Sequence, residues 1–352
     1  MKDKATFTIR DVARRAGVST TTVSRVLSNS GPVSAEARRR VEQAIQALSY
    51  RPSRMARSFR AQRSQFIGLI ISDVENPFYT SLVRAVEDVA YAHEYSLLLC
   101  NSDEDLDKER TYIQFMADER VAGVIGSPAS EAETSFAALF DARIPVVSVD
   151  RRSMRTPVDT VLLDNVAAAH SLTQHIIAHG HRRIAAILPS SGITSGRERL
   201  CGFLQAMEEA GIEPDTNLVY EGKGSEEFGR QTTHMLLDRS DRPTAIFAGN
   251  NLITLGVLRA IQERRLRVPD DLAVVGLDEM PWMSLLAPGI TVAAQPIHEM
   301  GQLAMQILLE RIAGDRRPPR EVKMAPRLII RSSVAGRPLP ETVSFNGNNK
   351  RR

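Results

Sequence analysis

Short apolar runs alternate with segments of helical periodicity from Phe66 onward. An apolar run bounded by turn residues predicts a buried strand, and apolar residues three and four apart predict a helix that covers it. Alternation of this kind is typical of parallel sheets with helices on both faces. The expected strands are 66–72, 96–101, 121–126 and 145–149, and the expected helices begin at Pro77, Asp107 and Glu131.

The same alternation restarts at Ile184, which predicts a second lobe of similar design. A chain of 352 residues exceeds what one core usually serves, so a two-lobed body plus a small module is expected. The fold class predicted for the body is α/β, with two doubly wound parallel sheets. Its further strands are 184–188, 218–220, 245–248 and 273–276, with helices from about Asn165, Ser195, Ser225 and Asn250.

The first fifty residues carry the signals of three short helices. Thr8 and Asp11 form a capping-box pattern, and Gly17 marks the end of that first helix. Ser19 can cap a second helix and Ser34 a third. Because only a few residues around Gly17 separate the first two helices, they predict a helix-turn-helix. The third helix is expected to close the core of this module.

Charge is distributed unevenly along the chain. Residues 1–60 hold 13 Lys and Arg against 4 Asp and Glu, whereas the rest holds 32 against 38. A compact module with a net charge of +9 is attracted to a polyanion, and phosphate contacts supply most non-specific affinity for DNA. If the charge were the only signal, the alternative interpretation would be a basic surface that faces solvent and binds no partner.

In a helix-turn-helix, the early residues of the second helix meet base edges in the major groove. Thr21 and Arg25 are four residues apart and share a face, and arginine suits bidentate contact with guanine. Pairing of Arg25 with a carboxylate or a phosphate is the alternative. Hydroxyl groups here suit phosphate contacts or helix capping, which position the protein without reading sequence. The headpiece residues expected at DNA are Thr8, Ser19, Thr20, Thr21, Thr22, Ser24 and Arg25.

Residues 50–60 follow with a proline that stops the third helix. Ser53 can cap a new helix that is too short to be stable alone, so we expect this segment to become ordered only when docked. Ala56 and Phe59 can wedge between base steps in the minor groove, while flanking arginines such as Arg57 meet phosphates. Ser53, Ala56, Arg57 and Phe59 are therefore further candidate DNA contacts.

Polar side chains follow the predicted strands of both lobes. Open α/β lobes bind ligands at the carboxyl ends of their strands, so a cleft between the lobes is the expected ligand site. Carboxylates, amides and arginines beside an aromatic ring suit a sugar or a similar polar metabolite. Trp282 can either stack on such a ligand or pack beneath its loop. The segments at this edge are 73–79, 150–151, 190–199, 250–251 and 278–282.

The N-terminal motifs together resemble the lactose-repressor/galactose-repressor (LacI/GalR) family of bacterial transcription regulators. They are TIRDVA (8–13), AGVS (16–19), TVSRVL (22–27) and YRPS (50–53). The resemblance implies that Thr20, Thr21 and Arg25 read an operator. It also implies that residues 53–60 form a hinge helix that pairs with its dimer mate in the minor groove. Phe59 departs from the leucine usual in this family, which leaves the preferred central base step open.

The resemblance extends over residues 1–336 through motifs such as NPFY (76–79), GRER (196–199) and GLD (276–278). It implies a periplasmic-binding-protein-like core. Asn251 stands where the family frequently has aspartate, so the class of effector is less defined. The residues that match effector-contacting positions are Phe78, Asp150, Arg151, Arg199, Asn250 and Asp278.

These observations predict a sequence-specific transcriptional regulator, expected to be a repressor, that binds a pseudo-palindromic operator as a homodimer. A small polar effector between the lobes would control operator affinity, as inducer or as corepressor. No apolar run approaches the length of about 20 residues that a membrane span needs, and the two cysteines make no disulfide framework, so a cytoplasmic location is expected. The expected domains are 1–50 (helix-turn-helix), 51–63 (hinge), 64–336 (effector-binding and dimerisation core) and 337–352 (disordered tail).

Two other classes of function compete with this interpretation. A dehydrogenase would need a glycine fingerprint, but in residues 222–227 Glu227 occupies the third glycine position. A hydrolase would need a G-x-S-x-G elbow, which is absent, and His179 and His181 lack companion metal ligands. A sugar-binding transport protein would share the body but need a secretion signal and no DNA-binding module. We therefore expect no catalytic residues, no cofactor, no metal and no membrane contact.

Overall fold

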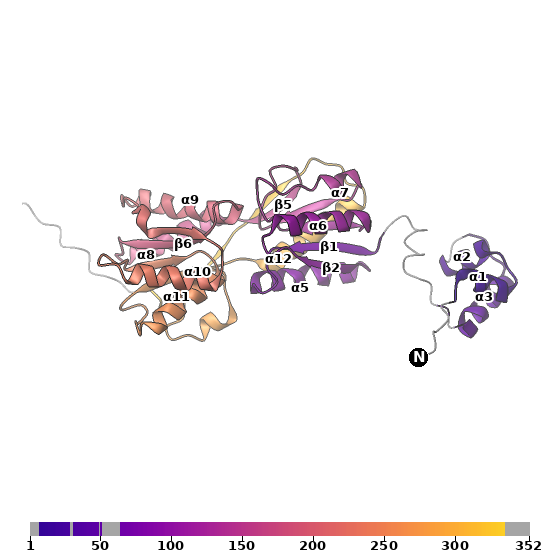
Figure 1. The fold of residues 1–352 in the computed structure, drawn as a ribbon, viewed down its shortest axis with the longest axis horizontal. Helices are drawn as coiled ribbons and strands as arrows, with labels where there is room; N and C mark the ends of the chain where they lie inside the picture. Colours follow the sequence, from indigo (N-terminus) through magenta and orange to yellow (C-terminus); the bar gives the residue numbers. More distant parts are fainter. Residues whose placement is uncertain (1–6, 29–30, 49, 51–63, 335–352) are drawn as a thin grey trace, which may run out of the picture. The chain divides into compact units, whose positions relative to one another are not determined.

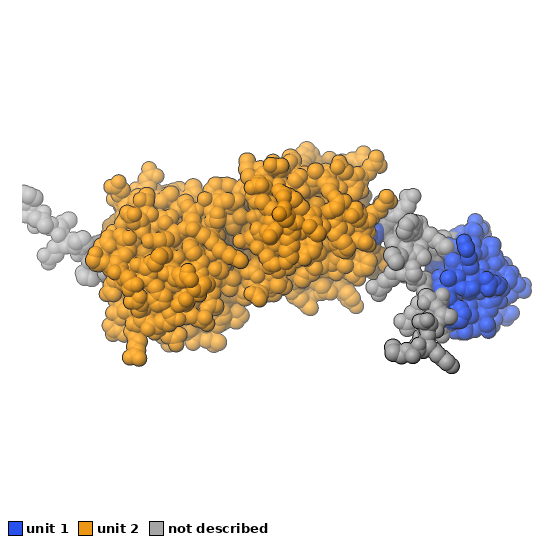
Figure 2. All heavy atoms as spheres, viewed as in Figure 1, with its two compact units in different colours: residues 1–64 blue, residues 65–352 orange. Residues whose placement is uncertain are grey.

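The computed structural model describes residues 7–28, 31–48, 50 and 64–334. The protein divides into two compact units, residues 1–64 and 65–352 (Figure 2). Each unit has its own apolar core. The hinge expected at 51–63 and the tail expected at 337–352 lie outside the described residues.

The first unit is a small helical bundle around a dry core. Val12, Val23 and Val41, one from each helix, are fully buried. Gly17 ends the first helix at φ 63°, a left-handed conformation that glycine adopts without steric cost. The helix-turn-helix and its third helix are therefore confirmed. The helices are α1 (Ile9–Ala16), α2 (Thr20–Ser28) and α3 (Ala35–Leu48).

Side-chain caps fix where these helices begin. The Asp11 carboxylate accepts from the backbone amide of Thr8 at 2.9 Å and from its hydroxyl at 2.7 Å. The Ser19 hydroxyl accepts from the amide of Thr22 at 3.1 Å, and the Ser34 hydroxyl accepts from the amide three residues on at 3.3 Å. Each cap contributes about 1 kcal/mol to helix stability. The caps expected from the sequence are thus the ones that begin the helices.

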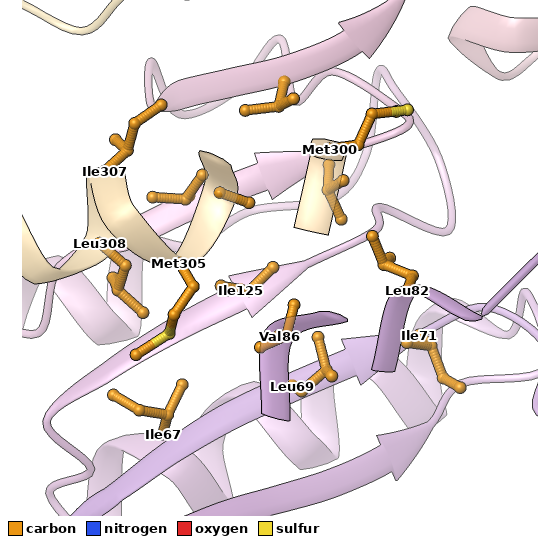
Figure 3. Packing of buried hydrophobic residues seen from close by; sticks show 14 of the residues in the cluster. Ile67, Leu69, Ile71, Leu82, Val86, Ile125, Met300, Met305, Ile307 and Leu308 are labelled. Atoms are coloured by element: carbon orange, nitrogen blue, oxygen red, sulfur yellow. The ribbon is translucent and has the colours of Figure 1, made fainter. Parts of the chain in front are cut away.

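The first lobe of the second unit has a fully parallel sheet with helices on both faces (Figure 1). Helices α5 and α12 cover one face, where Leu82 and Met305 join Ile67 and Ile125 in one buried apolar cluster (Figure 3). Helices α6 and α7 cover the other face. The strands, in spatial order, are β11 (Glu321–Met324), β5 (Asp159–Leu163), β4 (Val146–Val149), β3 (Gly123–Gly126), β1 (Phe66–Ile71) and β2 (Ser96–Asn101); the helices are α5 (Pro77–Ala92), α6 (Leu106–Asp118), α7 (Ala137–Asp141) and α12 (Ile297–Ile312).

The second lobe repeats this design with one antiparallel edge strand, β12, beside β10. Helices α8 and α9 pack on one face, where Phe203 stacks near Phe247, and α10 and α11 pack on the other. The strands, in spatial order, are β12 (Arg327–Ile329), β10 (Thr291–Ala294), β9 (Ala273–Leu277), β8 (Ala245–Ala248), β6 (Ile184–Pro189) and β7 (Val219–Gly222); the helices are α8 (Asn165–Ala178), α9 (Thr194–Glu209), α10 (Glu226–Leu237) and α11 (Asn251–Glu263), with 3-10 turns η1 (Thr216–Leu218) and η2 (Pro281–Ser284).

The chain passes between the lobes three times. It leaves the first sheet after β5 and enters the second lobe with α8. It returns after β10 to place α12 and β11 in the first lobe, and crosses again to β12. The two-lobed α/β class is confirmed. The sequence pattern did not predict that α12 and β11 return to the first lobe.

Some predicted boundaries are wrong. The helix expected from Glu131 begins only at Ala137, as α7, because residues 131–133 form a turn and residues 134–136 are irregular. The buried carboxylate of Glu109 holds this loop, since it accepts from the Ala129 amide at 2.8 Å and from the Thr134 hydroxyl at 2.6 Å. Other ends shift by one or two residues; Ser225 and Asn250, for example, are N-caps rather than first helical residues.

Candidate functional site

The outward face of α2 carries the side chains predicted to meet DNA. Thr20, Thr21 and Arg25 are exposed, whereas Val23 and Val26 of the same helix point into the core. Among residues 7–28, 31–48 and 50, Arg25 forms no ion pair and no hydrogen bond. Pairing with a carboxylate of the described headpiece is thus not seen, and the guanidinium is available to an external partner.

The hydroxyl residues of the headpiece have a structural role of their own. Ser19 caps α2 and shares a second hydrogen bond with the Thr22 hydroxyl at 2.9 Å. Thr8 hydrogen-bonds to Asp11, and these bonds lower the pKa of the Asp11 carboxyl. Ser24 is half-buried in α2. The predicted contacts Ser53, Ala56, Arg57 and Phe59 lie outside the described residues.

A cavity of about 1180 Å³ lies between the two lobes of the second unit. The segments after β1 and β6 line this cavity. In each sheet the chain continues from this strand to one side and then returns to its other side, so the strand order reverses there. Ligands of doubly wound sheets bind at such switch points. The six residues predicted to contact an effector all line this cleft: Phe78, Asp150, Arg151, Arg199, Asn250 and Asp278.

On the first lobe, Asp150 and Arg151 form the buried floor of the cleft directly after β4. The Tyr79 hydroxyl donates to Asp150 Oδ2 at 3.2 Å, and burial raises the pKa of Tyr79 well above its ordinary value. Arg151 donates through Nη2 to Glu104 at 2.6 Å and through Nη1 to the Pro128 carbonyl at 3.2 Å. Its Nε lies 3.4 Å from Asp150. The backbone of Asp150, at φ 68°, is left-handed, a strained conformation that is concentrated at functional sites.

On the second lobe, Arg199 and Asp278 are nearly fully buried. Arg199 donates through Nε to Asn165 at 2.9 Å and through Nη1 to the Gly249 carbonyl at 2.8 Å. The Asp278 carboxylate accepts from Gln295 Nε2 at 2.6 Å and from the Asn251 amide at 3.2 Å. Burial raises the pKa of Asp278, and the charge of Arg199 opposes this shift.

The cap of α11 places a further amide in the cleft. Asn250 Oδ1 accepts from the Ile253 amide at 2.7 Å, and its Nδ2 donates to the Gly224 carbonyl at 3.0 Å. Asn251, next in the chain, is buried and points to the first lobe, where its Nδ2 donates to Asn76 Oδ1 at 2.9 Å. Asn251 therefore links the two lobes.

The structure also shows the surroundings of Trp282 and His181, for which the sequence left a ligand-binding role open. Trp282 is half-buried in η2 and packs with Met280 and Met283, so it packs beneath its loop. His181 shares a hydrogen bond with Thr244 at 2.9 Å. Within the described parts of the chain, no group of three or more His, Cys, Asp or Glu side chains is placed to hold a metal ion. No helix there is long and apolar enough to span a bilayer.

The cleft also contains residues that sequence reasoning did not assign. Asn101 ends β2, and Asp103 and Glu104 follow it; residues 222–227 begin at the last residue of β7. Both strands were expected, so applying the rule of carboxyl ends to them would have found these residues. Gln295 directly follows β10, which runs parallel to β9, but no strand was expected there from the sequence, so the rule could not be applied to it.

A helix-turn-helix headpiece followed by a two-lobed core with a polar cleft defines a ligand-responsive DNA-binding regulator. Family models match both parts: "Bacterial regulatory proteins, lacI family" at residues 8–53, and "Periplasmic binding protein-like domain" at residues 173–334. The chain belongs to the lacI family of bacterial regulatory proteins and is a DNA-binding transcriptional regulator.

Relatives match over nearly the whole chain. The HTH-type transcriptional repressor PurR of Serratia proteamaculans (strain 568) is 37% identical over 333 residues, 94% of this chain and 98% of its own. The HTH-type transcriptional regulator DegA of Bacillus subtilis (strain 168) is 34% identical over 331 residues, 93% of this chain and 98% of its own.

Two solved structures extend the comparison. The Lac repressor dimer bound to operator and the anti-inducer ONPF has a TM-score of 0.81 at 28% identity, covering 94% of this chain and 99% of that one. The complex of the transcriptional regulator CelR with cellobiose has a TM-score of 0.71 at 30% identity, covering 93% and 99%. Both the family and the two-lobed fold predicted from the sequence are thereby confirmed.

Proposed function

We propose that this regulator is a repressor that binds a pseudo-palindromic operator as a homodimer, with a small polar effector in the cleft controlling its operator affinity. The guanidinium of Arg25 is exposed and pairs with no side chain of the described headpiece, and this observation carries the DNA-binding part of the proposal. Two headpieces on one site double the contacts, with half-sites about one helical turn apart. The structure of the Lac repressor dimer on its operator supports this arrangement by similarity.

On α2, Thr20, Thr21 and Arg25 read base edges, while Thr8, Ser19, Thr22 and Ser24 contact phosphates or cap helices. The hinge residues Ser53, Ala56, Arg57 and Phe59 contact the DNA at the operator centre, where Ala56 and Phe59 enter the minor groove and Arg57 meets a phosphate. Such a protein meets its operator on the nucleoid in the bacterial cytoplasm. Selection of binding sites from random duplexes, followed by footprinting, tests this part. A selected consensus with twofold symmetry is expected, and a chain that selects no sequence would contradict the proposal.

Effector control is proposed from the contacts that join the lobes across the cleft. Arg152 on the first lobe pairs with Glu198 on α9 at 2.7 Å, and the Arg152 amide donates to the Thr194 hydroxyl at 2.8 Å. Asn251 makes the hydrogen bond to Asn76 at another point. A ligand that touches both walls changes the balance of these contacts, and with it the angle between the lobes and the separation of the hinge segments of a dimer.

The coupling between effector and operator must be reciprocal and amounts to about 1–3 kcal/mol in typical systems. The ligand acts as an inducer if it favours an angle between the lobes that weakens operator binding. It acts as a corepressor if it favours an angle that strengthens operator binding. The test is a titration of operator affinity at increasing effector concentration. An unchanged operator affinity at saturating effector would remove the regulatory part of the proposal and leave the DNA-binding part intact.

A further inference from the structure

A second face of the headpiece carries a surplus of positive charge. In their sequences, α1 and α3 hold six arginines against three carboxylates. The role proposed for the headpiece uses Arg25 of α2 and none of these six, so their charge has no assigned partner. The arginines are Arg10, Arg14, Arg15, Arg38, Arg39 and Arg40.

Helical spacing turns the centre of this surplus away from the core. Arg14 stands two residues after the buried Val12, and Arg39 stands two residues before the buried Val41. In a helix with 3.6 residues per turn, each arginine therefore points about half a turn away from the core. The side chain of Arg14 is 81% exposed. Four exposed arginines are called the basic face below: Arg14, Arg15, Arg39 and Arg40.

The packing of α1 on α3 joins these arginines into one surface. Both helices contribute to the apolar core of the headpiece. Arg40 reaches the C-terminal end of α1, where its Nη1 atom lies 3.8 Å from the position that a Cβ would take at Gly17. Arg14 and Arg15 occupy the last turn of α1, just before this glycine. The basic face thus extends from the end of α1 to the second turn of α3.

The basic face differs from the face that is proposed to meet the operator. Val23 of α2 is buried in the same core, so Thr21 and Arg25 point outward from α2. Three helices packed around one core turn their outward faces in three different directions. A duplex whose major groove admits α2 therefore leaves Arg14 and Arg39 free for another partner.

The charges of the basic face are mostly unpaired within the described part of the headpiece. Arg14 lies 3.5 Å from Asp11, and this is the one ion pair among those residues. Glu36 stands four residues before Arg40, a spacing that allows an ion pair, but the structure contains none between them. Arg39 forms neither an ion pair nor a hydrogen bond with the described headpiece.

Helix stabilisation does not account for this arrangement. A positive charge near the C-terminus of a helix interacts favourably with the helix dipole, which explains Arg14 and Arg15 in the last turn of α1. Arg39 and Arg40 lie in the second turn of α3, nearer its N-terminus, where a positive charge gains nothing from the dipole. Adjacent like charges also repel each other. An external anion would supply the partner that these two arginines lack.

The surroundings of the basic face favour the backbone of a DNA duplex as this anion. Guanidinium groups bind phosphate oxygens through two parallel N–H donors. A single-stranded nucleic acid would need aromatic side chains for stacking, and a protein partner would need large apolar anchors. Among the described headpiece residues, only Phe7, which precedes α1, is an exposed large apolar side chain. A row of phosphates needs only the charges that are present.

We propose that the basic face is a second DNA-binding site, which holds the phosphate backbone of another duplex segment while α2 is seated in the operator. Arg39 and Arg40 are its central contacts, and Arg14 and Arg15 extend it. Because phosphate contacts carry no sequence information, the second segment can have any sequence. The inference rests on the proposed operator contact of α2 and goes beyond it, since the protein then connects two stretches of DNA.

The test is a titration of the preformed complex between the full chain and its selected operator. A second duplex of unrelated sequence carries the fluorescent label, and its anisotropy reports capture by the complex. Saturable capture is expected, and its affinity should fall with rising salt, with a slope in log units of about 0.9 for each phosphate contact. A complex that captures no second duplex at low salt overturns the inference.

A double variant addresses the residues themselves. Arg39→Gln with Arg40→Gln is expected to weaken capture of the second duplex at least about tenfold and to lower its salt slope by about 2, because two phosphate contacts are lost. Operator affinity should be unchanged, which also shows that the headpiece is folded. Arg242→Gln with Arg316→Gln removes equal charge from exposed positions of the second unit and is the matched control. Capture by this control should equal that of the unchanged chain.

The contrary results are distinct from one another. An equal loss of capture in the control variant would show that only net charge matters. A parallel loss of operator affinity in the Arg39 and Arg40 variant would place these arginines at the operator itself. Duplex RNA or polyglutamate that displaces the second duplex at a lower concentration than unlabelled DNA would assign the face to another partner. Each of these overturns the inference alone, whereas a chain that selects no operator contradicts the proposed function and this inference with it.

Discussion

The side-chain amide of Asn251 donates to the side-chain oxygen of Asn76 across the cleft at 2.9 Å. The same Asn76 oxygen accepts from the amide of Phe78 and so caps α5. Asn251 must therefore present its NH₂ group, since Asn76 Oδ1 has no proton to give. One hydrogen bond thus ties the cap of a first-lobe helix to the start of α11.

We predict that Asn251→Asp weakens the contact between the lobes. A carboxylate at 251 cannot donate to Asn76. The loss of this buried hydrogen bond destabilises the arrangement in which the two lobes are in contact by about 1 kcal/mol. Effector affinity should fall several-fold, measured by calorimetry. Asn76→Asp is the matched control, because aspartate caps helices equally well and still accepts from Asn251. Equal losses in the two variants would contradict the role given to the Asn251 donor.

The exposed guanidinium of α2 leads to a prediction about DNA sequence. Arg25→Ala should relax specificity at one base position per half-site and cost about 1–3 kcal/mol on the preferred sequence. Arg57→Ala should weaken binding to all sequences by a similar factor, because it removes a phosphate contact. Binding-site selection with each variant distinguishes these effects. A uniform loss for Arg25→Ala would reassign that side chain to the DNA backbone.

The buried carboxyl of Asp278 leads to a prediction about pH. Its pKa is raised by burial, so above that pKa the folded chain holds a charge that the unfolded chain solvates better. The contribution of Asp278 to stability is therefore more favourable at low pH and declines as pH rises through the raised pKa. The difference in melting temperature between Asp278→Asn and the unchanged chain should therefore be more favourable to the variant at pH 7 than at pH 4.5. A difference independent of pH would be the contrary result.

An ion pair between the lobes leads to a prediction about stability. Glu131 is buried and its carboxylate pairs with Arg197 on α9, whose side chain is 48% exposed. Arg197→Met leaves that carboxylate without its partner, and we expect a loss of about 1–2 kcal/mol after allowing for solvent screening. The double variant Glu131→Leu with Arg197→Met should lose less than Arg197→Met alone. Additive losses in thermal denaturation would show that the two side chains are uncoupled.

The parts of the fold that sequence predicted are those in which local pattern and burial agree. Strands such as 66–71 are apolar throughout because both faces of the sheet are covered, and the headpiece caps are local hydrogen bonds. The helix expected from Glu131 begins only at Ala137, because the structure of the segment before it depends on distant partners. Glu109 holds the loop and Arg197 pairs with Glu131 itself, neither of which a local pattern reports.

The candidate cleft was predictable to a similar degree. Residues directly after strands, such as Asp150 and Asp278, follow from the topology of any doubly wound sheet. Gln295 also directly follows a parallel strand, but it was not found in this way because that strand, β10, was not predicted from the sequence. The hydrogen bond between Asn76 and Asn251 joins residues 175 positions apart, and only the folded chain brings them together.

Because β11 and α12 complete a sheet whose other strands end at residue 163, neither lobe corresponds to a continuous piece of the gene. A truncation after β10 would strip the first lobe of a helix that covers one face of its sheet and would expose the Ile67 and Ile125 side chains. Exchange of ligand specificity between homologous proteins by recombination must therefore transfer both lobes together, with the N-terminal junction near residue 64, the boundary along the chain between the two compact units.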